Sequence, residues 1–148
     1  MNNTNRYPNE LSFSRYFVKA LKNDGHFVQR IESGLTGKGI PDIFAIVEGT
    51  PMWIELKRVK RKVAKSNAIP WRPGQRAWLR SVGVHMMAYT CVMFEDCIGV
   101  ITHGMHPSRP LDYPKNKVPK DKMFICCSAS AAADYMAFGM PPAKIMKE

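Results

Sequence analysis

The chain has 148 residues, of which 45% are hydrophobic and 23% are charged. This length predicts one domain with a real core, and this composition excludes a disordered tail. The 22 lysines and arginines outnumber the 12 aspartates and glutamates, which leaves a net charge of +10. The four cysteines form no regular framework, and neither a bilayer-spanning apolar run nor an N-terminal signal is present. We therefore expect a soluble, basic, cytoplasmic protein that has no membrane partner.

The first half of the chain predicts a helix, a strand and a hairpin. Asn9 suits a helix N-cap, and apolar residues at helical spacing continue until Asp24-Gly25. Residues 26–33 are typical of a strand and lead into a glycine-rich loop. Two β-branched runs then flank residues 48–51, which predicts a hairpin with a four-residue turn.

The second half predicts a loop, a second helix and another strand pair. The basic stretch 60–69 lacks periodicity, and a helix is expected between Pro73 and Gly83. Strands are expected at 85–94 and 97–103, and a short helix at about 130–138. Four prolines within 104–122 indicate an irregular extension. The order of elements predicts an α/β protein with one mixed sheet flanked by helices. Residues 1–103 are expected to form the core of the fold. Residues 104–148 are expected to form a proline- and lysine-rich extension with a short helix, packed on the same domain.

The positive charge is concentrated in one part of the chain. No aspartate or glutamate occurs from Leu56 to Phe94, a stretch that carries nine lysines and arginines as well as two tryptophans. Such a block favours nucleic acid, because phosphate neutralisation releases counterions. A merely solvated basic face is the simpler alternative, and an anionic membrane surface is a weaker one. The residues expected to contact nucleic acid are Lys38, Arg58, Lys60, Arg61, Lys62, Lys65, Arg72 and Arg76.

Three polar residues of the predicted hairpin are expected to share one face. Glu55 and Lys57 alternate with the core-facing positions of their strand. A turn that pairs Val47 with Met52 places Asp42 opposite Lys57, so two carboxylates and an ammonium converge. Paired carboxylates suit Mg²⁺ or Mn²⁺, which can polarise a phosphodiester and activate water. The pattern therefore predicts a metal-dependent nuclease, although a simple turn and a surface ion pair are the plainer interpretations.

These residues resemble a known signature. Gly39-Ile40-Pro41-Asp42 and Trp53-Ile54-Glu55-Leu56-Lys57 are similar to the motifs of the PD-(D/E)XK nuclease superfamily, whose fold is restriction-endonuclease-like with an αβββαβ core. Residues 73–79, PGQRAWL, resemble the VRR-NUC branch of that superfamily. Standalone domains of this size are typical of bacteriophages and bacteria, and some resemble Holliday-junction resolvases.

The resemblance implies a role for each matching residue. Asp42 and Glu55 would bind the metal together with the backbone carbonyl of Leu56, and Lys57 would be the catalytic lysine. Gln75 would support the site, although it can also be read as a capping residue of the first helical turn. Glu10 matches an acidic residue of the first helix in many members, although a favourable charge at a helix N-terminus explains it nearly as well.

The expected function is that of a Mg²⁺- or Mn²⁺-dependent DNA endonuclease. The resemblance further implies branched DNA such as a Holliday junction as substrate, a homodimer with paired sites, and a role in phage or bacterial recombination, repair or replication. Two alternatives remain open: an inactive nucleic-acid-binding module with the same fold, and an end-dependent DNA exonuclease.

Overall fold

Runs of strands are separated by helices along the chain. The computed structural model describes residues 7–31, 39–104 and 116–139. Its elements are α1 (Glu10–Asn23), β1 (Phe27–Arg30), β2 (Ile43–Val47), β3 (Thr50–Arg58), β4 (Ser66–Ala68), α3 (Gln75–Gly83), β5 (Met87–Met93), β6 (Ile98–Gly104), β7 (Lys117–Pro119), the 3₁₀ turn η3 (Lys120–Lys122), β8 (Phe124–Cys126) and α4 (Ala129–Phe138). None of the helices within these ranges is long and apolar enough to span a membrane.

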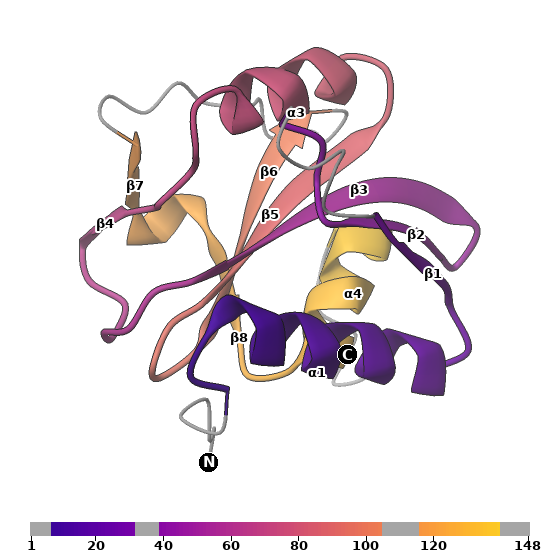
Figure 1. The fold of residues 1–148 in the computed structure, drawn as a ribbon, viewed down its shortest axis with the longest axis horizontal. Coiled ribbons are helices and arrows are strands. Elements are labelled where there is room, and N and C mark those ends of the chain that lie inside the picture. Colours follow the sequence, from indigo (N-terminus) through magenta and orange to yellow (C-terminus); the bar gives the residue numbers. More distant parts are fainter. Residues whose placement is uncertain (1–6, 32–38, 105–115, 140–148) are drawn as a thin grey trace.

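The main sheet has six strands in the order β1-β2-β3-β5-β6-β8. β3 and β5 pair in parallel, whereas the other neighbours are antiparallel. Parallel strands need a long crossover connection, and the connection between β3 and β5 contains α3, which lies on one face of the sheet, while α1 and α4 cover the other face (Figure 1). The predicted α/β architecture, a mixed sheet flanked by helices, is confirmed.

Helix α1 begins and ends as its sequence predicts. The Asn9 side chain accepts a hydrogen bond from the Ser12 amide at 2.9 Å, and the Ser12 side chain completes the capping box. Phe13, Phe17 and Leu21 are fully buried at helical spacing. This apolar stripe fixes α1 against the sheet.

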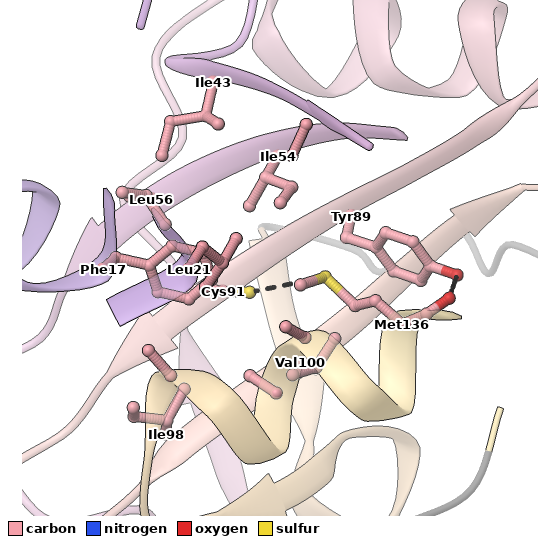
Figure 2. Close-up of a cluster of buried hydrophobic side chains, with 14 of the residues drawn as sticks. Phe17, Leu21, Ile43, Ile54, Leu56, Tyr89, Cys91, Ile98, Val100 and Met136 are labelled. Atoms are coloured by element: carbon pink, nitrogen blue, oxygen red, sulfur yellow. Dashed lines mark hydrogen bonds between the residues drawn. The ribbon is translucent and has the colours of Figure 1, made fainter. Parts of the chain in front are cut away.

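The main hydrophobic core lies between the sheet and helices α1 and α4. Ile54 and Leu56 of β3 pack here with α1 and α4 side chains (Figure 2). The hydroxyl of Tyr89 donates a hydrogen bond to the carbonyl oxygen of Met136 at 2.9 Å, which ties β5 to α4. Because side chains alternate along a strand, this core-facing row turns Glu55 and Lys57 to the α3 side of the sheet.

The β2–β3 hairpin differs from its predicted register. Its turn has two residues, Glu48 and Gly49, with φ values of 51° and 79°, as a type I′ turn requires. Val47 pairs with Thr50, so the expected pairing of Val47 with Met52 is wrong. The correction is a shift of two positions, which keeps every side chain on its expected face.

Two segments that were expected to be irregular form a small second sheet. β4 lies in the predicted loop 60–69 and pairs with β7, within the predicted extension 104–122. The buried side chain of Asn67 binds the backbone of Ala64 and the carbonyl of Val118, which holds the two strands together. Residues 105–115 of that extension lie outside the described residues.

Candidate active site

Asp42 and Glu55 meet where the β2–β3 hairpin opens. Ile43 pairs with Ile54, so the register continues to Asp42 opposite Glu55 rather than opposite Lys57 as predicted. Asp42 Oδ2 accepts a hydrogen bond from the amide of Leu56 at 2.9 Å. The carboxylate is thereby held against the strand that carries Glu55 and Lys57.

Glu55 is a buried acid with one unpartnered oxygen. Its side chain is 1% exposed, and Oε2 accepts from Gln75 Nε2 at 3.0 Å and lies 3.3 Å from Lys57 Nζ. Oε1 is buried and accepts no hydrogen bond, although the Glu55 and Asp42 carboxyls are close enough for a hydrogen bond when one of them is protonated. Burial is the main reason that the pKa of Glu55 is raised to about 8; the nearby Asp42 carboxyl also raises this pKa, whereas Lys57 lowers it. A buried carboxyl with an orphaned oxygen marks a position that a cation would complete.

The start of α3 holds Gln75 against Glu55. Gly74 precedes the helix in the left-handed conformation with φ 89°, and Gln75 Oε1 accepts from the Arg72 amide at 2.7 Å. A Cβ on Gly39 would meet the Gly74 carbonyl oxygen at 2.8 Å, so the chain before Asp42 passes closely under this turn. The structure thus brings Gln75 to Glu55, as a supporting role requires.

Glu10 lies at the edge of the site. It is the exposed first residue of α1 and lines a cavity of about 140 Å³ together with Arg30, Asp42 and Leu56. Glu10 and Asp42 therefore line the same opening, whereas Glu55 is not among its lining residues.

The donor set fits a hard divalent cation. No three His, Cys, Asp or Glu side chains gather into a metal cluster within the part of the chain that the structure describes. The carboxylates of Asp42 and Glu55, with the backbone carbonyl of Leu56, remain as candidate ligands. Mg²⁺ is commonly held by one or two carboxylates and keeps waters and phosphate oxygens as its other ligands. The orphaned Glu55 Oε1 and the mutual repulsion of the two acids agree with such an ion.

The expected basic surface divides into three groups. Lys60, Arg61, Lys62 and Lys65 are exposed between β3 and β4, whereas Lys38 lies outside the described residues. Arg58 does not belong to the exposed surface: it is buried, and its guanidinium donates to the carbonyl oxygens of Tyr7, Val59 and Met93. The physical reason is that Arg58 ends β3 beside three backbone carbonyls, each of which has a lone pair available for one of its N–H groups.

A third basic group lies beside α3. The exposed Arg72 and the half-buried Arg76 line a cavity of about 370 Å³ together with Trp71, Asn116 and Arg80. The guanidinium of Arg76 lies 5.1 Å from the centroid of the Trp71 ring and donates to Asn116 Oδ1 at 2.6 Å. Arg80 was not among the expected contacts, although its spacing of four from Arg76 could have indicated it.

Comparison with known proteins bears on the fold. No family model matches the sequence, and no curated protein matches it. Among solved structures, the chain is similar to Hjc of Archaeoglobus fulgidus, a Holliday junction resolvase from an archaeal hyperthermophile, with a TM-score of 0.57 and 18% sequence identity. The match covers 82% of this chain and 97% of that chain. The fold is restriction-endonuclease-like. Within it, α1, β1, β2, β3, α3 and β5 form the αβββαβ core. At this identity the similarity establishes the fold alone, so function must be argued from the site.

Proposed function

We propose that this protein is a Mg²⁺- or Mn²⁺-dependent DNA endonuclease whose active site contains Asp42, Glu55 and Lys57. The observation that carries the proposal is Glu55 Oε1, a buried carboxyl oxygen with no partner, which belongs to an acid opposite a second acid. A purely structural carboxylate at this depth would have both oxygens satisfied. Two adjacent acids, one of which has an oxygen without a donor, are better explained as a site for phosphodiester chemistry than as part of a surface ion pair.

Each residue has a defined part in this proposal. Asp42, Glu55 and the Leu56 carbonyl hold the ion, which when bound polarises the phosphodiester and lowers the pKa of a water ligand. Lys57 places a positive charge beside the acids, where it stabilises charge that develops on the phosphate. Gln75 holds Glu55 Oε2 and so aims the free oxygen of that carboxylate. Glu10 adds a negative charge to the cavity that Asp42 also lines.

The cavity beside α3 supports DNA as the substrate. Arg72, Arg76 and Arg80 line it, and no acidic residue is among its described lining residues. Arginines bind phosphates through paired N–H groups, which positions a duplex without reading its sequence. Together with the exposed lysines between β3 and β4, this surface favours recognition of DNA shape.

Branched DNA is the substrate class that we propose. The support is the fold shared with a protein described as a Holliday junction resolvase. A junction has two strands to cut, so we further propose a homodimer with paired sites, which light scattering of the purified protein tests directly. Bacterial or phage DNA recombination, repair or replication in the cytoplasm is the setting that this activity fits.

One substrate panel tests the proposed activity. Purified wild-type protein and Glu55→Gln are incubated with four-way junction, flap, single-stranded DNA, linear duplex and circular plasmid, with Mg²⁺, with Mn²⁺ or with a chelator. We expect metal-dependent internal cuts, fastest in branched DNA, and none by Glu55→Gln despite retained binding. Binding without cleavage by the wild type would indicate an inactive module. Degradation of linear DNA with intact plasmid would indicate an end-dependent exonuclease.

A further inference from the structure

Three buried polar side chains form a hydrogen-bonded chain behind the candidate active site. Trp71 Nε1 donates to Thr90 Oγ1 at 3.1 Å, and Thr90 Oγ1 lies 2.8 Å from His103 Nε2. The exposed fractions of Trp71, Thr90 and His103 are 7%, 0% and 5%. The three residues come from the segment before α3, from β5 and from β6, so the chain joins three separate parts of the fold.

The donors and acceptors of the Trp71–Thr90–His103 hydrogen bonds are mutually consistent. Burial, together with Arg76 and Arg80, lowers the pKa of His103 to about 3, so the ring is neutral at physiological pH. The Thr90 oxygen accepts the indole N–H, and its second bond joins Nε2 of His103, with the direction set by which nitrogen of the neutral ring carries the hydrogen. Each polar group between the indole and the imidazole is satisfied, which gives the Trp71 side chain a fixed position.

The same segment leads directly to Glu55. Trp71 is followed by Arg72, whose amide donates to Gln75 Oε1 at 2.7 Å. Gln75 Nε2 in turn donates to Glu55 Oε2 at 3.0 Å. Thr90 is also the register partner of Glu55 across the parallel β3–β5 pair. The hydrogen-bonded chain and the acid are therefore joined both through the sheet and through the turn before α3.

We propose that Trp71, Thr90 and His103 are positioning residues, which hold the turn at residues 71–75 so that Gln75 fixes the Glu55 carboxylate. None of them touches the reacting groups in this account. They act through Gln75, whose two amide ends bind Arg72 and Glu55. The kinetic part of this inference rests on the proposed nuclease function, while its structural part does not.

A pair of substitutions at Thr90 separates hydrogen bonding from packing. Thr90→Val keeps the shape of the side chain but removes the hydroxyl, whereas Thr90→Ser keeps the hydroxyl and removes a methyl group. Trp71→Phe removes the indole N–H from the other end and serves as the second variant if Thr90→Val does not fold. A merely structural role predicts that Thr90→Val lowers the free energy of unfolding without changing the Gln75 signals.

Nuclear magnetic resonance of the glutamine side chains reads the position of Gln75 without any activity. The chain contains two glutamines, Gln29 and Gln75, and Gln29 is exposed on β1. We expect slowly exchanging Gln75 amide protons in the wild type and in Thr90→Ser. In Thr90→Val and Trp71→Phe they should shift and exchange at least tenfold faster, while the Gln29 signals stay in place. Unchanged Gln75 signals in both of these variants would overturn the proposal.

Steady-state cleavage gives the second readout. Misplacement of a catalytic group by about 1 Å can cost on the order of a hundredfold in rate. We expect kcat of Thr90→Val to fall at least tenfold with KM for DNA within twofold, and Thr90→Ser to remain near the wild type. Equal kcat values for all three proteins would contradict the inference. Altered Gln75 signals in a protein whose wild type cuts no DNA would instead refute the nuclease function and leave the positioning intact.

Discussion

Lys57 Nζ lies 3.3 Å from Glu55 Oε2, and the two side chains are 3% and 1% exposed. A buried ion pair recovers its desolvation cost only when its geometry is good and its other polar atoms are satisfied. Here Glu55 Oε1 is left without a partner. The pair is therefore poorly explained as a stabilising contact, and its geometry agrees with the active site that we propose.

Removal of the lysine charge should abolish most of the proposed activity. Lys57→Met keeps the apolar stem but removes the ammonium, and we expect kcat for DNA cleavage to fall by roughly 10²–10³. Affinity for DNA should change little, because the exposed arginines remain. Lys19→Met, at an exposed position of α1, is the control for loss of one positive charge. Turnover near the wild-type value in Lys57→Met would remove this lysine from the chemical step.

The stability of the metal-free protein should fall as the pH rises through the range set by Glu55. The pKa of Glu55 is about 8 in the folded protein against 4.5 for an ordinary glutamate. Between these values the folded state keeps a proton that the unfolded state has lost, so the free energy of unfolding decreases toward pH 8. Glu55→Gln should remove this component. Urea denaturation with a chelator at pH 5.5 and 8.5 measures it, and the same pH dependence in both proteins would speak against the raised pKa.

Divalent metal should stabilise the folded protein through the acidic pair. Binding to the folded state alone adds RT ln(1 + [L]/Kd), about 2.7 kcal/mol at a hundredfold excess over Kd. Thermal unfolding with Mn²⁺ should show this gain for the wild type, more strongly at pH 8 than at pH 6, because the metal requires ionised Glu55. The gain should vanish in Asp42→Asn and Glu55→Gln but persist in Glu48→Gln, a change in the exposed turn. An equal gain in all four proteins would place the metal elsewhere.

Gly39 should tolerate substitution much less well than a glycine of the same backbone conformation. Gly39 and Gly25 both have φ 89°, but a Cβ on Gly25 would meet nothing within 4 Å, whereas one on Gly39 would meet the Gly74 carbonyl oxygen at 2.8 Å. Alanine at either position carries the left-handed strain of about 1–2 kcal/mol. Gly39→Ala should add about 1–3 kcal/mol of overpacking. Denaturant titration of the two variants isolates the contact, and equal losses would exclude it.

The grouping of Asp42, Glu55 and Lys57 could be predicted from the sequence because it depends on alternation along the strands. A hairpin register that is wrong by two positions leaves the faces unchanged, and the actual error was of this kind. The turn length was missed because Glu48, a residue other than glycine, adopts φ 51°. A glutamate rarely adopts a positive φ, and the residues around Glu48 do not indicate that the pairing of β2 with β3 requires one.

Features that depend on distant segments could not be predicted. Arg58 was counted with the exposed basic residues because a charge total does not show which side chain meets the carbonyls of Tyr7 and Met93. Strand β4 has three residues and a partner about fifty positions away, so no periodicity indicates it. Trp71 and Thr90 are 19 positions apart in the sequence, and Thr90 and His103 are 13 apart, so no local pattern indicates their hydrogen bonds either. Long-range pairing, rather than propensity, decides these parts.

Helix α4 has a consequence for the strand that carries the acids. Its small side chains Ala129, Ala132 and Ala133 fill the same apolar layer as Ile54 and Leu56, on the side of β3 opposite Glu55. Without that layer the apolar face of β3 would be exposed to solvent. The packing that keeps Glu55 and Lys57 on the opposite face of the strand would then be lost. We therefore expect a proteolytic cut between β8 and α4 to disturb the candidate active site, although α4 itself contributes no polar side chain to that site.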